Sequence, residues 1–150
     1  MVRYFIRGLI DGSLSTLGIV IGASIAIGLS PEAARIIVAA GIGGGIANGL
    51  SNIIGAFAAE KTVAEKRILL SSVIDGLATI GGSVIPVLPF FILPALPALE
   101  WSIAVTLALF FSIGIYIGRV SRENLALSGF KMVLFAAATA GIAALIKIVM

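Results

Sequence analysis

Five stretches of this chain are each long and apolar enough to cross a lipid bilayer as a helix, for which about 20 residues are needed. Hydrophobic residues make up 60% of the sequence and charged residues 11%, whereas a soluble domain carries about 25% charged residues. Lipid must therefore surround most of the chain. We predict an all-α integral membrane protein, a single transmembrane domain over residues 1–150. Its expected spans are Phe5–Leu29, Ala33–Ala59, Ile68–Leu93, Trp101–Ile117 and Phe130–Val149.

Lysine and arginine are distributed unevenly among the segments that connect these spans. One side of the membrane would carry Arg3, Arg7, Lys61, Lys66, Arg67, Arg119, Arg122 and Lys131, and the other side only Arg35 and Lys147. The cytoplasmic connections of membrane proteins are enriched in these two residue types. The pattern predicts a multi-pass protein of the cell membrane, with the N-terminus cytoplasmic and the C-terminus outside.

The chain contains no cysteine and no histidine. This absence excludes disulfides, thiolate nucleophiles and imidazole-based catalysis, and no other nucleophile with a matching base is visible. We therefore expect a protein that is not an enzyme and that holds no resident cofactor. The net charge of +3 comes from residues in short connections rather than from a basic patch with interleaved aromatics. No nucleic-acid partner is expected.

Two aspartates lie inside apolar spans, each in an Ile-Asp-Gly sequence: Asp11 in the first span and Asp75 in the third. An ionised carboxylate at this depth costs roughly 3 kcal/mol on the lowest scales, so such residues usually handle a partner, an ion or a proton. No lysine or arginine is expected at comparable depth, although Arg7, one helical turn before Asp11, could pair with it. Two interpretations are open. The aspartates line a cation pathway, or they pair with basic residues of a partner protein.

Other polar residues share helix faces at steps of three or four residues. Ser15 follows Asp11 on the first span, and Asn48, Ser51 and Asn52 share a face of the second. Serine and asparagine also hydrogen-bond between packed membrane helices, so packing explains the two asparagines equally well. As ligands, these groups would supply only oxygen atoms. Oxygen ligands suit Mg²⁺, Mn²⁺, Fe²⁺ or Ca²⁺ and do not select copper or zinc.

The candidate metal-binding residues are therefore Asp11, Ser15, Asn48, Ser51, Asn52 and Asp75. Aspartates in membrane transporters also relay protons, which makes Asp75 and Asp11 the candidates for proton coupling. The sequence leaves open whether Asp75 is a ligand, a proton carrier or a structural residue. In each case the metal would be a transported ion and not a cofactor.

Three segments of the chain resemble the vacuolar iron transporter family. Residues Arg7–Thr16 are similar to its Asp-Gly-Leu-Val-Thr opening, and Ser51–Lys61 resembles its Ser-Met-Gly-Leu-Gly-Gly-Tyr-Leu-Ala-Ala-Lys segment. Gly81–Phe90 is close to its Gly-Gly-Leu-Ile-Pro-Leu-Leu-Pro-Tyr run. The resemblance implies a proton-coupled exporter of Fe²⁺ and Mn²⁺ from the cytosol. It also implies a homodimer with the ion path along the subunit interface.

The chain departs from that family's pattern at three places. The family's metal-contacting methionine on the second helix falls at Asn52, and its acidic residue earlier in that helix falls near Gly44. Its cytoplasmic metal-binding insertion is absent, because only Glu60–Arg67 separates the second and third spans. The first-helix acid, Asp11, carries over. The resemblance thus implies a short member with an all-oxygen site that leans towards Mn²⁺ or a broader preference, and it leaves open whether Glu60–Glu65 gathers ions.

Overall fold

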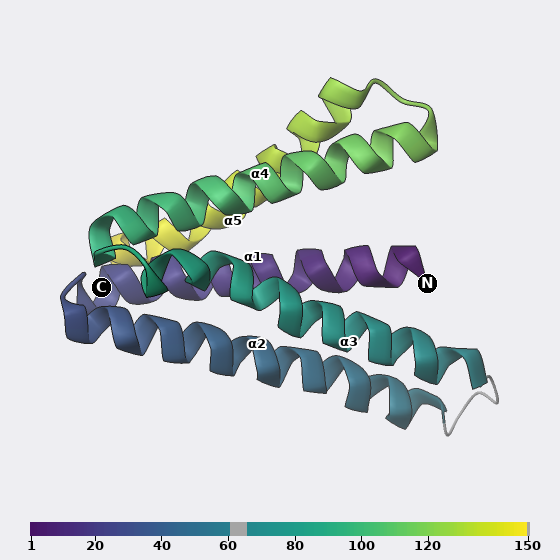
Figure 1. The fold of residues 1–150 in the computed structure, drawn as a ribbon, viewed down its shortest axis with the longest axis horizontal. Helices are drawn as coiled ribbons and strands as arrows, with labels where there is room; N and C mark the ends of the chain where they lie inside the picture. The colour runs from purple at the N-terminus through teal and green to yellow at the C-terminus, as the bar shows by residue number, and fades with distance from the viewer. Residues whose placement is uncertain (61–65, 150) are drawn as a thin grey trace.

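The computed structural model describes residues 1–60 and 66–149, in which five helices are each long and apolar enough to span a membrane. This confirms the predicted all-α fold with five spans (Figure 1). The elements are α1 (Val2–Ile27), α2 (Pro31–Glu60), α3 (Lys66–Val87), the short 3-10 helix η1 (Leu88–Phe91), α4 (Ala95–Ser121) and α5 (Leu125–Val149). Residues 61–65, on which the question of ion gathering rests, lie outside the described part.

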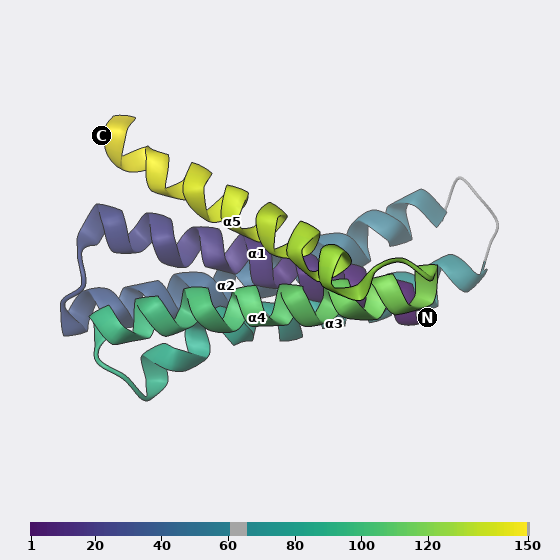
Figure 2. The same cartoon turned by 90° about the horizontal axis from the view of Figure 1, so that it is seen from above.

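The first three helices pack into one unit, and α4 and α5 form a hairpin beside it (Figures 1 and 2). α1 makes its most extensive contact with α3 and also touches α2, α4 and α5. Two apolar clusters hold it in this central place. Val20 packs with Ile37 of α2 and Val87 of α3, and Leu17 packs with Ala143 of α5. Any group on α1 therefore has neighbours from several helices.

Glycines let α1 and α3 approach until their backbones touch. A Cβ on Gly8 would collide with the carbonyl oxygen of Asp75, and a Cβ on Gly12 would collide with the carbonyl oxygen of Thr79. Small residues at a helix crossing in a membrane allow this close backbone contact. The contact places Asp75 and Thr79 beside the first turns of α1, where the polar residues of the site lie.

The last two helices begin earlier than the apolar pattern predicted. α4 starts at Ala95 rather than near Trp101, because Pro97 lies in its first turn, where a backbone N–H has no partner within the helix. α5 starts at Leu125 rather than near Phe130. There the side-chain oxygen of Asn124 accepts a hydrogen bond from a first-turn backbone N–H over 3.1 Å, as capping residues do. A hydropathy pattern detects neither the proline in the first turn of α4 nor the asparagine that caps α5.

The two ends of the chain lie at opposite ends of the molecule, as an odd number of spans requires (Figure 1). Which end faces the cytoplasm stays a prediction from the charge pattern. We expect a reporter fused after Met150 to be active outside the cytoplasm, and one inserted after Arg122, between α4 and α5, to be active inside. A cytoplasmic reporter at Met150 would contradict the predicted orientation.

Candidate functional site

The polar side chains predicted on the first two spans meet between α1 and α2. The side-chain nitrogens of Asn48 and Asn52 both donate to one carboxylate oxygen, Oδ2 of Asp11, over 3.0 and 3.1 Å. The two asparagines lie one helical turn apart, so both amides reach the same oxygen. Asp11 itself is partly exposed. The carboxylate is thereby bound by two neutral donors, and no basic side chain among those that the structure describes binds it.

Ser15 belongs to this group and Ser51 does not. Ser15 donates its hydroxyl hydrogen to the backbone oxygen of Asp11 over 2.7 Å and accepts a hydrogen bond from Asn48 over 3.3 Å. Ser51 is exposed, and within the described residues it makes no hydrogen bond to Asp11 or to either asparagine. We call the group that the structure brings together the Asp11 cluster: Asp11, Ser15, Asn48 and Asn52.

Asp75 lies outside this cluster because Arg7 binds it. The guanidinium donates from Nε to Oδ1 of Asp75 over 3.0 Å and from Nη2 to Oδ2. Asp75 is 1% exposed, whereas the side chain of Arg7 is 67% exposed. The expectation that no basic group reaches this depth is therefore wrong. Arg7 binds Asp75 rather than Asp11 because the glycine contact at Gly8 draws the backbone of Asp75 against this part of α1.

Thr79 belongs to the site, although it was not among the predicted site residues. Its hydroxyl accepts a hydrogen bond from Asn52 over 3.1 Å and donates one to the backbone oxygen of Asp75 over 2.9 Å. The side chain is fully buried. Its place one helical turn after Asp75, on the same face, is the signal that could have found it. Hydrogen bonds thus run from Asp11 through Asn52 and Thr79 to the backbone of α3.

The Asp11 cluster is open towards the surface of the single chain. Ser15 is exposed, and a Cβ on Gly18 of α1 or on Gly43 of α2 would meet no atom within 4 Å. In the described ranges, no three acidic, histidine or cysteine side chains gather into a metal-binding group. One chain therefore offers a single carboxylate among neutral groups, which would neutralise only half the charge of a divalent ion.

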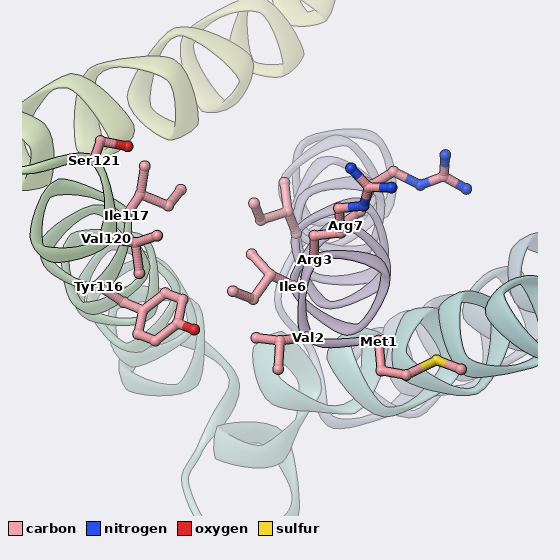
Figure 3. A pocket seen from close by; sticks show the side chains of 10 residues that line it. Met1, Val2, Arg3, Ile6, Arg7, Tyr116, Ile117, Val120 and Ser121 are labelled. Atoms are coloured by element: carbon pink, nitrogen blue, oxygen red, sulfur yellow. The ribbon is translucent and has the colours of Figure 1, made fainter.

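A cavity of about 670 Å³ lies between the first turns of α1 and the last turns of α4 (Figure 3). Val2 and Ile6 point into it from α1 and Val120 from α4, whereas the guanidinium groups of Arg3 and Arg7 turn away. No residue of the Asp11 cluster lines this space. The cavity is apolar and separate from the polar site.

The oxygen atoms of the Asp11 cluster determine what it can bind. Among the side chains that the structure describes, the hydrogen bonds of the cluster reach Oδ2 of Asp11, and none reaches Oδ1 of Asp11 or of either asparagine. Carboxylate, amide and hydroxyl oxygens together form a donor set for hard cations. The cluster contains no thiolate, imidazole or thioether. Such a set of oxygen ligands, inside a pair of membrane-spanning helices, suits hard cations.

Comparison with known proteins agrees with this description. A model of the VIT family matches residues 64–147, more than half of the chain. An uncharacterized protein of Methanocaldococcus jannaschii is 44% identical over 165 residues, an alignment that covers 92% of this chain and 84% of that protein. The predicted family resemblance is confirmed, and the family indicates a metal-ion transporter rather than an enzyme. This chain is a multi-pass membrane protein that belongs to the VIT family.

Proposed function

We propose that this protein exports a divalent metal cation, Mn²⁺ or Fe²⁺, from the cytosol across the cell membrane in exchange for protons. The observation that carries the proposal is the carboxylate of Asp11, which binds the amides of Asn48 and Asn52 inside a pair of membrane-spanning helices. A carboxylate at that depth is costly, and among the described residues Asp11 has no salt bridge. Family membership supplies the class of cargo.

The all-oxygen donor set supports Mn²⁺ as the preferred ion. Asn52 stands where the resemblance places a methionine in the family. An amide oxygen is a harder ligand than a thioether sulfur, so this exchange favours harder cations. We therefore expect Mn²⁺ to be at least as good a substrate as Fe²⁺ when both are measured in the same flux assay.

A second copy of the chain would cover the open face of the Asp11 cluster. Polar groups that face lipid are costly, and dimers with twofold symmetry are the commonest assemblies of identical chains. Two copies would also bring two Asp11 carboxylates together, which matches the charge of one divalent ion. We propose a homodimer with the α1 helices near the twofold axis and the ion path along the interface.

Cysteine crosslinking in membranes tests this dimer. Single cysteines at Gly18 or Gly22 should link two copies, because the open face of α1 would meet its counterpart. A cysteine at Leu134, which is 70% exposed on α5, is the matched control and should not crosslink. A protein that remains monomeric in lipid bilayers would contradict the proposal.

Proton coupling is proposed for the same carboxylates. Asp11 can bind a metal ion or carry a proton, so a high proton concentration on one side would promote release of the metal there. Asp75 is the second candidate. Its two oxygens bind Arg7, which supports a role beside the ion path rather than as a ligand. Its part in proton transfer stays a prediction.

The alternative is a non-transporting membrane subunit whose intramembrane aspartates pair with basic residues of a partner protein. Because Arg7 of the same chain binds Asp75, this alternative now concerns Asp11. The lack of a basic partner for Asp11 among the described residues is the observation that favours it. Flux of Mn²⁺ and Fe²⁺ through the purified protein in liposomes, with an imposed pH gradient, separates the two functions. Flux above that of protein-free liposomes supports the transporter. No flux of either ion in either gradient direction would favour the subunit.

A further inference from the structure

We propose that Thr79 is a positioning residue, which holds the amide of Asn52 as a hydrogen-bond donor towards Asp11 and thereby limits how tightly the site binds its cation. The inference rests on the proposed function, because it concerns affinity for the transported ion. On this proposal Thr79, a buried residue of α3, determines whether the side-chain oxygen of Asn52 on α2 can bind the ion.

The direction of the hydrogen bonds around Thr79 carries the argument. A threonine hydroxyl has one hydrogen, and Thr79 donates it to the backbone oxygen of Asp75 over 2.9 Å. Towards Asn52 the hydroxyl oxygen can therefore only accept, and the Asn52 side-chain nitrogen lies 3.1 Å away. Thr79 thus selects the NH₂ side of the amide. The same nitrogen lies 3.1 Å from Oδ2 of Asp11.

Thr79 is well placed to impose this orientation. It is 0% exposed, and the backbone contact at Gly12 presses α1 against its carbonyl group. The orientation of the Asn48 amide is restrained in the same way, because Ser15 donates its hydroxyl hydrogen to a backbone oxygen and can only accept from Asn48. That restraint is looser, because the bond is longer, at 3.3 Å, and Ser15 is exposed. Asn52 is therefore the amide whose orientation is set most firmly.

In this orientation Asn52 presents hydrogen atoms, and not its carbonyl oxygen, towards a cation bound at Asp11. Ligation by Oδ1 requires the amide to turn about its Cβ–Cγ bond, which breaks the bond to Thr79 and brings two oxygen lone pairs together. One such hydrogen bond corresponds to roughly a threefold to tenfold change in an equilibrium constant. Thr79 therefore weakens cation binding by about that factor. A transporter gains from this, because a tightly bound ion leaves slowly on the far side.

Thr79→Val tests the inference, because valine keeps the shape of threonine and lacks the hydroxyl. We expect the half-saturating Mn²⁺ concentration of the flux to fall roughly threefold to tenfold, and the maximal flux to fall as well because release slows. Damage to packing would raise the half-saturating concentration instead. Thr79→Ser keeps the hydroxyl, so its half-saturating Mn²⁺ concentration and its maximal flux should both equal those of the unmodified protein. Thr106→Val is the matched control, since it removes a buried hydroxyl that bonds only within α4, and it should change neither quantity.

The side-chain NH₂ signals of Asn52 give a readout that needs no metal. In labelled protein in lipid nanodiscs, hydrogen exchange at this NH₂ should be slow in the unmodified protein and faster in Thr79→Val, but unchanged in Thr106→Val. Unmoved signals, or weaker Mn²⁺ binding by Thr79→Val, would overturn the inference and leave the proposed function standing. If the unmodified protein moves no Mn²⁺, the proposed function fails, and the NH₂ signals alone decide whether Thr79 orients Asn52.

Discussion

Replacing Asp11 by asparagine is expected to reduce Mn²⁺ and Fe²⁺ flux in liposomes to the level of protein-free liposomes. Asparagine keeps the size of the side chain and one oxygen that can accept from Asn48 and Asn52, so the helices should still pack. The substitution removes the charge that attracts the cation. We expect cation affinity to fall by roughly two orders of magnitude, about 2.7 kcal/mol. Metal flux, together with thermal unfolding and oligomeric state, gives the result.

Glu100→Gln is the matched control for this variant. Glu100 is an exposed residue of α4, so its substitution removes the same charge away from the Asp11 cluster. Its flux should equal that of the unmodified protein. If Asp11→Asn also transported metal normally, Asp11 would be structural, and the transporter proposal would rest on family membership alone.

The second large effect is expected from Arg7→Gln, and it concerns stability. Asp75 is 1% exposed and has Arg7 as its ion-pair partner. Removing one partner of a fully buried pair costs roughly 3–5 kcal/mol, and because the side chain of Arg7 is largely exposed we expect a loss at the low end of that range, about 3 kcal/mol. The reciprocal variant Asp75→Asn should cost much less, because the side chain of Arg7 is 67% exposed and its guanidinium can turn to water. The free energy of unfolding in detergent measures this asymmetry.

The double variant Arg7→Gln/Asp75→Asn should recover most of the stability lost in Arg7→Gln, since two neutral amides can hydrogen-bond in place of the ion pair. Lys131→Gln serves as the control. Lys131 lies 3.9 Å from Glu123, and both side chains are more than half exposed, so its loss should cost less than about 1 kcal/mol. Equal losses in the two single variants, or no recovery in the double variant, would show that this pair does not hold α1 to α3.

Asp75→Asn also decides the proton-carrier role predicted for this residue. If Asp75 carries the coupled proton, the variant should still bind Mn²⁺, but its flux should no longer depend on the pH gradient. If Asp75 acts only through Arg7, that dependence should remain.

Much of the fold could be read from residue type and order. The five spans follow from the length of each apolar stretch, and the start of α2 follows from Ser30-Pro31-Glu32, where Ser30 Oγ accepts a hydrogen bond from a backbone N–H over 3.1 Å. The shared face of Asn48 and Asn52, and that of Asp11 and Ser15, was also predicted, because residues one turn apart share a helix face whatever the helix packs against. These properties are local, so no tertiary contact is needed to specify them.

Only the tertiary structure decided the partners of the two aspartates. Along the sequence, Arg7 lies one turn from Asp11, and the local rule for helices pairs them. The crossing at Gly8 and Gly12 instead brings α3 against α1, so Arg7 binds Asp75 and Thr79 reaches Asn52. These pairings depend on how closely two helices approach and how each is rotated about its axis. The spacing of residues along one helix predicts neither the distance between two helices nor their rotation, because both depend on the shapes of the two surfaces that meet.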